Sequence, residues 1–531
     1  MSFQGTVQAV RRRSHWGWGY EDERPTLDEV REAAAGLVAH LGFGSTEVEE
    51  PVPLADVAFP APRLEPPADV QAICSTETYD RAAHAYGKAY RDVVRAFRGR
   101  FDHPPDVVAY PRDEADVERV LAWCADAGAA LIPYGGGTSV VGGVEPRVDG
   151  PAVTLDLRAL DALLEVDGAS RAARIQAGAS GPRLEDQLAE HGFTLRHFPQ
   201  SFALSTLGGW IATRAGGHFA TLYTHIDDLV ESVRALTPTG AWQSRRLPGS
   251  GAGPSPDRLL LGSEGTLGVI TEAWVRVQPK PVHRAAVTVR FPSFQQGADA
   301  VRAIAQSGLY PANCRLIDRR EARMMLAGDG SADLLVLGFE SADHELGAWL
   351  ERALQLCGAF GGRWDEPRRS GREGAAGAWR DAFLRAPYLR DTAIAAGIFQ
   401  ETFETAITWD RFPAFNEAVL GAATEAVRRA SGGQGQVTVR FTHVYPDGPA
   451  PYYTMVAPAR RGDELEQFAE IKAAASDAVI AAGGTITHHH AVGRDHRPWY
   501  DRQRPEPFAQ ALRAAKAAVD PRGILNPGVL V

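Results

Sequence analysis

The fold of this chain is decided by the stretch Ala130-Leu131-Ile132-Pro133-Tyr134-Gly135-Gly136-Gly137-Thr138-Ser139. Its first five residues are mostly apolar and predict a strand, which ends where the glycines begin. Glycines carry no Cβ, so their backbone N–H groups can approach a phosphate closely, and Thr138 and Ser139 add hydroxyl donors. The loop therefore predicts a phosphate-binding turn, although a tight turn between two strands would explain the same glycines.

The residues that precede this loop predict a β-α-β unit. Val107-Val108-Ala109-Tyr110 is typical of a short strand, Asp113 of a helix N-cap, and Gly128 of a helix C-terminal cap. Between the two caps, apolar residues recur at the helical spacing of i, i+3, i+4 and i+7, namely at Val117, Val120, Leu121 and Cys124. The glycine loop thus follows the second strand of the unit.

The loop matches neither of two common nucleotide motifs. A Rossmann fingerprint needs G-x-G-x-x-G at the start of a helix, but Val140 and Val141 follow the loop here and do not favour a helix start. A P-loop needs Gly-Lys-Ser/Thr, which is absent from the loop. The sequence therefore predicts neither a Rossmann protein nor a P-loop protein.

Two more stretches of small and hydroxyl residues follow the first loop. One contains Pro199-Gln200-Ser201 and then Ser205–Thr213, and the other is Gly262–Thr271. We expect these residues to lie in loops rather than in helix interiors. Three such loops within about 140 residues indicate a long ligand that contains phosphate and lies across an α+β domain.

The bulk composition is that of a globular protein with more than one domain. A chain of 531 residues is longer than the chains that usually fold around a single hydrophobic core. Its net charge of −10 argues against nucleic acid as a partner. The four cysteines show no zinc-like spacing, no apolar stretch has the length of a membrane span, and the N-terminus lacks the apolar region of a signal peptide. We therefore expect a cytoplasmic protein, with peripheral membrane contact left open.

Strand-like and helical patterns divide the chain into four regions. Pro279-Lys280-Pro281 is a break after which a new strand begins, and alternating strands and Ala-rich helices continue to about residue 480. The expected divisions are a largely helical or irregular region at 1–100, a ligand-binding domain at 101–282, a cap at 283–480 and a C-terminal segment at 481–531. A helix is predicted near Pro505–Val519.

Three consecutive histidines, His488-His489-His490, follow a Gly-Gly turn near the end of the chain. Thr485-Ile486-Thr487 is rich in β-branched residues and predicts a strand, in which His488 and His490 would share one face and His489 the other. Imidazoles exchange protons near neutral pH and bind anions when charged. A metal site would need further ligands, and without an HExxH or a matching carboxylate pattern we predict none.

Three further polar side chains are candidates for a site, but each has an ordinary alternative. Arg315 lies in a strand-like stretch, where an exposed arginine in a surface salt bridge is as common as a functional one. Arg390 precedes a predicted helix and could be a solvated helix end. Tyr452 follows a turn-rich loop, where a tyrosine usually packs or donates a hydrogen bond.

The ordered set of three loops resembles the flavin-binding domain of the vanillyl-alcohol oxidase superfamily, which is shared with p-cresol methylhydroxylase. The resemblance covers roughly residues 103–280. It implies an α+β fold, with a PCMH-type FAD-binding domain made of two α/β subdomains and an α+β cap with an antiparallel sheet. It also implies FAD, bound non-covalently because the first loop has no histidine. The implied cofactor-binding residues are Pro133, Gly135, Gly136, Gly137, Thr138, Ser139, Pro199, Gln200, Ser201, Thr206, Gly208, Gly209, Ala212, Thr213, Glu264, Gly265, Thr266, Gly268, Val269 and Ile270.

Within that superfamily, nearly the whole chain resembles the alkyldihydroxyacetonephosphate synthases. The resemblance is carried by Trp16-Gly17-Trp18-Gly19-Tyr20, by Pro199–Trp210, by Glu401–Thr405 with Trp409-Asp410-Arg411, and by the histidine run with Val492-Gly493. It implies that a fatty alcohol replaces the acyl group of acyl-dihydroxyacetone phosphate through an adduct at flavin N5, in the synthesis of ether lipids. It also implies a homodimer.

The resemblance implies a role for each of the candidate side chains. Tyr452 would do acid/base work on the substrate, and Arg390 would clamp its phosphate. Arg315 would lie nearer the flavin and the acyl end. His489 and His490 would assist protonation and phosphate binding, with His488 beside them.

The chain also departs from this family. Ala491 replaces the usual glycine after the histidines, and Thr442-His443-Val444-Tyr445-Pro446 differs from the polar run that precedes the family's tyrosine. The main alternative is therefore another enzyme of the superfamily, an FAD-dependent oxidase or dehydrogenase of a 2-hydroxy acid or alcohol.

Overall fold

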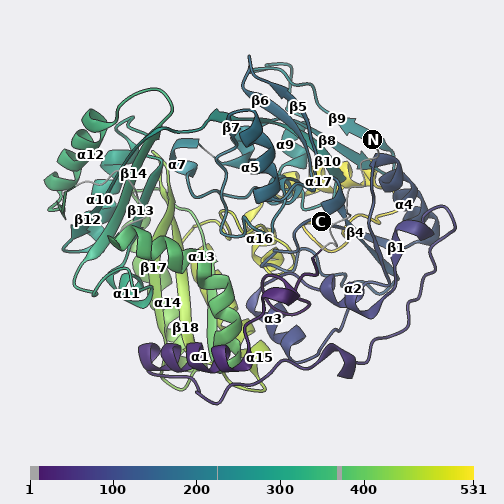
Figure 1. Cartoon of the computed structure of the whole chain (residues 1–531), viewed down its shortest axis with the longest axis horizontal. Coiled ribbons are helices and arrows are strands. Elements are labelled where there is room, and N and C mark those ends of the chain that lie inside the picture. The colour runs from purple at the N-terminus through teal and green to yellow at the C-terminus, as the bar shows by residue number, and fades with distance from the viewer. Residues whose placement is uncertain (1–10, 224, 367–373) are drawn as a thin grey trace, which may run out of the picture.

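A computed structural model describes residues 11–223, 225–366 and 374–531, and in helix α13 it describes side chains from residue 385 onward. It contains three main β-sheets, of four, five and seven strands. Figure 1 shows the seven-stranded sheet on one side of the molecule and the two smaller sheets on the other. Each sheet has a hydrophobic core of its own.

The four-stranded sheet contains the predicted β-α-β unit. Its strand order is β1 (Cys74–Ser75), β2 (Val107–Ala109), β4 (Ala152–Asp156), β3 (Ala130–Tyr134). Strands β2 and β3 both run parallel to β4, and α4 (Glu114–Ala127) crosses between them. Asp113 caps the helix by accepting a hydrogen bond from the N–H of Asp116, and Gly128 ends it with a φ of 64°. This prediction is confirmed.

The five-stranded sheet is antiparallel throughout. Its strand order is β5 (Leu163–Asp167), β6 (Ala172–Gln176), β10 (Val269–Arg276), β8 (Val230–Thr237), β9 (Gly240–Gln243). Its helices are α5 (Gly181–Glu190), α6 (Leu207–Thr213), α7 (Ala220–Tyr223), α8 (Ile226–Leu229) and α9 (Asp257–Leu260), and a small sheet pairs β7 (Phe193–Thr194) with β11 (Gln278–Pro279). The chain that follows the glycine loop thus forms this second sheet with its helices.

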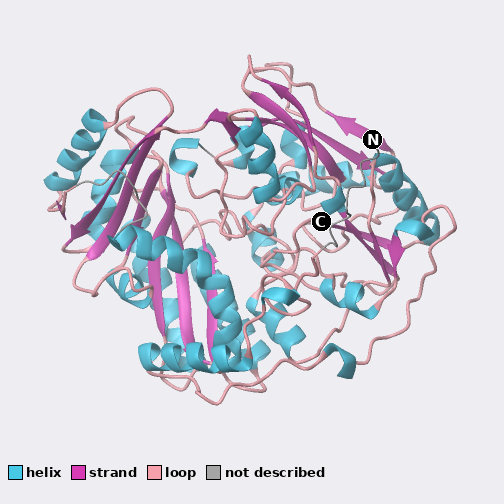
Figure 2. Ribbon diagram, in the orientation of Figure 1, coloured by secondary structure: helices cyan, strands magenta, loops and turns pink. Residues whose placement is uncertain are grey.

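The cap is built on the seven-stranded sheet, which is antiparallel as predicted. Its order is β15 (Arg363–Trp364), β12 (His283–Phe291), β14 (Asp333–Ser341), β13 (Asn313–Ile317), β17 (Gln436–Val444), β18 (Pro449–Pro458), β16 (Ile398–Glu404). Figure 2 shows helices packed along these strands. They are α10 (Phe294–Ala305), α11 (Arg319–Met324), α12 (Gly347–Ala359), α13 (Gly374–Ala395), α14 (Phe412–Ala430) and α15 (Glu464–Ala481).

The N-terminal region packs against the cap rather than standing apart. It contains α1 (Leu27–Leu41), α2 (Thr78–Ala83) and α3 (Tyr90–Phe97). Helix α3 buries Tyr90 and Phe97 in the cap core, where the ring of Tyr90 lies 4.8 Å from that of Phe399. This region therefore connects the cap to the strands that carry the glycine loop.

The C-terminal segment returns to the glycine loop. After α16 (Arg497–Gln503) and α17 (Glu506–Val519), Leu525 forms a parallel bridge with Leu131 of β3. The side-chain amide of Asn526 then donates to the carbonyl oxygens of Gly143 and Glu264, at 2.9 and 2.7 Å. The predicted terminal helix is confirmed, and the chain end fastens two cofactor loops to each other.

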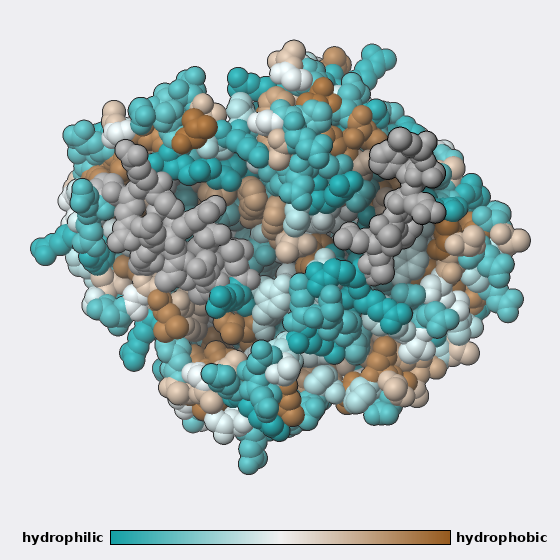
Figure 3. Space-filling model, in the orientation of Figure 1, coloured by the Kyte–Doolittle hydropathy of each residue, from teal (hydrophilic) through white to brown (hydrophobic). Residues whose placement is uncertain are grey.

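The face of the molecule in Figure 3 is mostly polar. Figure 3 shows polar side chains over most of the face in view, with small separate apolar patches. Within the three described ranges, no helix combines the length and the apolar character needed to cross a bilayer.

Candidate active site

A cavity of about 310 Å³ lies where the two small sheets, the cap and the C-terminal segment meet. It is lined by every predicted cofactor residue except Thr266 and Val269, and by every predicted catalytic residue except His488. The lining catalytic candidates are Arg315, Arg390, Tyr452, His489 and His490. Residues from four separate parts of the sequence therefore share one cavity.

The glycine loop offers unpaired donors to this cavity. The backbone N–H groups of residues 135–140 donate no hydrogen bond within the described part of the chain. A Cβ on Gly136 would lie 2.1 Å from the carbonyl oxygen of Leu204, so the loop can pass this close to its neighbour only with glycine. Consecutive free N–H groups in a concave loop are suited to phosphate oxygens.

The second predicted loop is in part a helix, which corrects the sequence interpretation. Gly208, Gly209, Ala212 and Thr213 belong to α6, and Thr206 caps that helix by accepting from the N–H of Gly209. A Cβ on Gly208 would lie 2.7 Å from Cβ of Ala177, so glycine allows this helix to pack closely against the backbone at Ala177. In the third loop, Val269 and Ile270 are likewise the first residues of strand β10.

Glu264 joins the third loop to the C-terminal segment. Its carboxylate accepts hydrogen bonds from the backbone N–H groups of Val492 and Gly493, at 2.9 and 2.8 Å. Burial raises the pKa of Glu264 to about 7, against the opposing effect of these two hydrogen bonds. The loop that lines the cavity is thereby tied to the histidine segment.

Arg390 is the cation best placed for an anionic ligand. It lies in helix α13 rather than before a helix, and its Nη1 donates to the carbonyl oxygen of Lys88 at 2.6 Å. Its Nε and Nη2 are buried and have no hydrogen-bond partner among the described residues. The Lys88 ammonium is also buried, which lowers the pKa of Lys88 to about 8. Two guanidinium donors are thus left for a ligand in the cavity.

Arg315 is buried rather than exposed in a surface salt bridge. It lies on β13, and its Nη1 is 3.0 Å from Nδ1 of His218. Burial, and then the charge of Arg440, lower the pKa of Arg315 to about 9, so its charge is kept at neutral pH. Arg440 itself pairs with Glu321. Two cations therefore lie on neighbouring strands of the cavity wall.

Tyr452 lies in strand β18 and not in the loop that precedes it. Its hydroxyl donates to Oγ1 of Thr402 at 3.0 Å, and its ring has the guanidinium carbon of Arg440 3.9 Å from its centre. Burial raises the pKa of Tyr452, while Arg440 and the hydrogen bond with Thr402 act in the opposite direction. The phenol is accordingly a proton donor at neutral pH.

The three histidines do not form a strand, so the prediction of alternating faces is wrong. Residues 485–490 form a chain of bends around the buried carboxylate of Glu404. That carboxylate accepts from the backbone N–H groups of His488, His489 and His490, at 2.7, 3.2 and 3.0 Å. Three N–H groups that point at one carboxylate cannot belong to an extended strand, in which they alternate.

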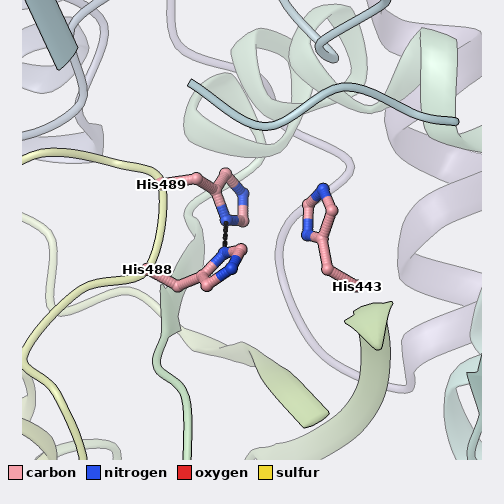
Figure 4. Close-up of side chains that lie close together, drawn as sticks. All are labelled: His443, His488 and His489. Atoms are coloured by element: carbon pink, nitrogen blue, oxygen red, sulfur yellow. Dashed lines mark hydrogen bonds between the residues drawn. The ribbon is translucent and has the colours of Figure 1, made fainter. Parts of the chain in front are cut away.

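The imidazoles therefore lie against one another. Nδ1 of His488 is 3.0 Å from Nδ1 of His489, and Figure 4 shows the ring of His443 facing both from strand β17. Nε2 of His488 lies 2.7 Å from the hydroxyl of Tyr445. Burial holds the pKa values of His443 and His488 well below the usual range and lowers the pKa of His490 to about 3, so these rings are neutral.

Several residues of the site were not predicted. The cavity also has Trp18, His218, Glu401, Thr402, Arg440 and His443 in its wall. Glu404 and His443 lie within stretches that the sequence analysis singled out. Their roles were not predicted, because the sequence around a single carboxylate or histidine does not show which distant residues it contacts. Arg440, Thr442 and Tyr452 lie at alternate positions of the neighbouring strands β17 and β18, so their side chains share one face of the sheet. The pairing register of the two strands would have been needed to predict this.

The arrangement combines three functions in one cavity. Free N–H groups can hold a pyrophosphate, and three arginines can hold a second anion. A buried phenol and neutral imidazoles can donate or accept protons between them. The site is thus built for a phosphate-containing cofactor and an anionic substrate that meet at a proton-transfer group.

Comparison with known proteins agrees with this geometry. Residues 105–244 match the model of an "FAD binding domain", and residues 280–530 match "FAD linked oxidases, C-terminal domain". An alkyldihydroxyacetonephosphate synthase from Dictyostelium discoideum is 30% identical, covering 85% of this chain and 77% of its own length. The synthase from Trypanosoma brucei brucei is 29% identical, covering 86% and 78%.

A solved structure shares the fold. A crystal structure of alkyldihydroxyacetonephosphate synthase superposes with a TM-score of 0.80, at 23% identity, over 97% of this chain and 98% of that one.

Proposed function

Because the chain belongs to the alkyldihydroxyacetonephosphate synthase family, we propose that it exchanges the acyl group of acyl-dihydroxyacetone phosphate for a long-chain fatty alcohol. It is an FAD-dependent enzyme. Of the two functions that the sequence left open, the comparisons support the synthase over an oxidase of hydroxy acids. The products of the exchange are the ether-linked phosphate and a free fatty acid.

The residues present fit FAD. The N–H groups of residues 135–140 are free to donate hydrogen bonds to its pyrophosphate. Position 136 requires glycine, because a side chain there would meet the carbonyl oxygen of Leu204. When bound, FAD supplies the covalent chemistry through which one carbon–oxygen bond is replaced by another. The adjacent α6 and β10 would line the rest of the cofactor.

The observation that carries the proposal is Arg390, with two buried donor nitrogens and no partner among the described residues. A planar guanidinium donates two parallel hydrogen bonds to a phosphate, which orients the substrate in the cavity. The carbonyl oxygen of Lys88 accepts a hydrogen bond from Nη1 of Arg390 and so holds that guanidinium in place. We propose that Arg390 binds the phosphate of the substrate.

Proton transfer is proposed for the side chains at the other wall. Tyr452 would move the proton at the reacting carbon, with Arg440 stacked on its ring to stabilise the phenolate form. His489 and His490 also line the cavity. They would donate a proton to the leaving fatty acid and accept one from the entering alcohol. Arg315 would hold negative charge near the acyl end.

The test is an exchange assay with the FAD-loaded protein. Palmitoyl-dihydroxyacetone phosphate and radiolabelled hexadecanol should give a labelled ether together with one palmitate for each ether formed. A parallel sample with a 2-hydroxy acid should keep its oxidised flavin colour. Bleaching by the hydroxy acid without any labelled ether would refute the synthase and favour the oxidase.

Other features stay predictions. These are the non-covalent binding of FAD, the homodimer, the cytoplasmic location and the peripheral contact with a membrane. The membrane contact follows from the proposed substrates, since both carry long alkyl chains that partition into bilayers. Flotation of the protein with phosphatidylcholine vesicles would test it.

A further inference from the structure

Three imidazoles converge on one point beside the cavity. His443 lies at the end of strand β17, whereas His488 and His489 lie in the C-terminal loop, as Figure 4 shows. Their ring centres form a nearly equilateral triangle, with sides of 4.9, 5.0 and 5.2 Å. One nitrogen of each ring lies within 4.8 Å of the others.

These spacings are close to those of a bound transition metal. Three nitrogens at about 2.0–2.1 Å from a tetrahedral Zn²⁺ are separated by about 3.4 Å. One nitrogen of each ring lies within 4.8 Å of the others, so rotation of the rings has to bring these nitrogens closer by up to about 1.4 Å.

The hydrogen bonds leave lone pairs at the centre. Nε2 of His443 lies 3.1 Å from the carbonyl oxygen of Gly217, which can only accept, so this nitrogen carries the proton. In the neutral ring, Nδ1 of His443 then has the lone pair. The Thr442 hydroxyl lies 3.1 Å from this nitrogen and can donate instead to the carbonyl oxygen of Ala450, at 3.4 Å. The contact between Nδ1 of His488 and Nδ1 of His489 likewise requires an unprotonated nitrogen on one of the two rings.

The surroundings are those of a metal ligand rather than of an isolated cluster. Nδ1 of His489 lies 3.3 Å from Oε2 of Glu404, and histidine ligands commonly donate their second nitrogen to such a carboxylate. Glu404 is buried and holds the loop through the backbone N–H groups of the histidines. The backbone of the loop that carries His488 and His489 is thus held in place before any ion arrives.

We propose that His443, His488 and His489 form a binding site for one divalent transition-metal ion of the Zn²⁺ class. Three imidazoles favour Zn²⁺, Cu²⁺ or Ni²⁺, whereas Mg²⁺ and Ca²⁺ prefer oxygen. His443 and His489 line the cavity, so the ion would lie at the cavity wall. The site departs from the prediction of no metal, and it depends on His443, one of the residues where the chain departs from its family.

The ion would act as an inhibitor of the proposed exchange. A metal on His489 takes up the lone pair with which this ring would accept a proton, so the proton-transfer wall loses a member. This consequence rests on the proposed function. The binding site does not, and its test is a measurement of metal rather than of turnover.

The experiment uses the FAD-loaded protein after treatment with EDTA and dialysis. Equilibrium dialysis against Zn²⁺ with elemental analysis should give one ion per chain. His443→Gln should raise the Kd at least about tenfold, because removal of a ligand costs no less than removal of a supporting group. His344→Gln, at an exposed histidine of the cap, is the matched control and should leave the Kd unchanged.

A measurement on the unaltered protein decides the case in which His443→Gln does not fold or does not hold FAD. X-ray absorption of the Zn²⁺-loaded protein should show a nitrogen shell with the scattering pattern of three imidazoles. Absence of stoichiometric Zn²⁺, an oxygen-only or sulfur shell, or equal affinity in a folded His443→Gln would overturn the site. Inhibition by Zn²⁺ that a chelator reverses should accompany binding, and uninhibited exchange at full occupancy would refute the inhibitory role alone.

Discussion

The guanidinium carbon of Arg440 lies 3.9 Å from the centre of the Tyr452 ring, and the two residues pair across strands β17 and β18. A cation over a phenol stabilises the ring most when the phenol carries negative charge. Arg440 is in turn held by Glu321, so the cation cannot move away when the charge on the tyrosine changes. The pair therefore forms a fixed acid/base unit in the cavity wall.

Tyr452→Phe should nearly abolish the exchange without loss of flavin. Removal of the hydroxyl leaves the ring and its stacking on Arg440 but no proton to move, so kcat should fall by about 10²–10⁴-fold. The labelled-alcohol assay and the flavin absorbance measure the two effects. Tyr453→Phe is the control: it removes a hydroxyl that binds Asn416 in the core, and turnover should stay within about twofold.

Arg390→Gln should weaken substrate use. The loss of a charge-assisted hydrogen bond to phosphate costs about 1.5–3 kcal/mol, which lowers kcat/KM by about 10–100-fold. Most of the change should be in KM, because the phosphate is bound in the ground state as well. Arg385→Gln, at an exposed position of the same helix, should have no effect. Equal kinetic constants for Arg390→Gln and the unaltered enzyme would contradict the phosphate assignment.

Glu404→Gln should disorder the histidine loop. The carboxylate accepts three backbone hydrogen bonds and one from Thr487, and a carboxamide can accept with only one oxygen. The free energy of unfolding should fall by about 1–3 kcal/mol, with a parallel loss of exchange. Urea unfolding followed by fluorescence measures the first, with Glu417→Gln on the exposed side of α14 as the control. Full activity in Glu404→Gln would show that the loop holds its shape without the carboxylate.

Gly136→Ala should abolish FAD binding. The new Cβ would lie 2.1 Å from the carbonyl oxygen of Leu204, so the loop would have to move away from its place. The protein should be purified colourless, and its melting temperature should no longer rise when FAD is added. Gly421→Ala in helix α14 has open space around the new methyl group and should be neutral or stabilising. A yellow Gly136→Ala protein of normal affinity would refute the cradle.

Stability should fall with rising pH because of Glu264. The folded pKa of Glu264 is about 7, above its usual value of 4.5, so the folded state binds the proton more tightly than the unfolded state. The contribution is complete below pH 4.5 and is lost as pH rises through 7, by about 3 kcal/mol in all. Urea unfolding at pH 5 and pH 7.5 measures the slope. Glu264→Gln, which has no proton to lose, should show a smaller difference between the two pH values.

The sequence predicted elements whose determinants are local. Asp113, Gly128 and the apolar spacing between them lie within one helix, so the unit before the glycine loop needs no distant information. The resemblance to a family added the set of site residues, most of which line one cavity.

The rest could not be predicted because distant residues determine it. The bends at 485–490 are set by Glu404, which is 84 positions before His488. Local propensity of Thr485-Ile486-Thr487 favours a strand, but a buried carboxylate needs several donors and takes them from the loop. In the same way His443 and Tyr445 meet the C-terminal loop only through the pairing of β17 in the cap sheet.

The return of the chain end to the first sheet sets a limit on how this protein is made. Asn526 donates to Gly143, which is 383 positions earlier. Ribosomes synthesise about 5–20 residues per second, so a new strand β3 waits about 20–80 s before its neighbour Leu525 leaves the ribosome. During that time β3 lacks its bridge partner Leu525, and the core of the sheet lacks Ile524 and Leu525. Aggregation competes with completion in this interval, and a variant truncated before Leu525 should be insoluble rather than a weakened enzyme.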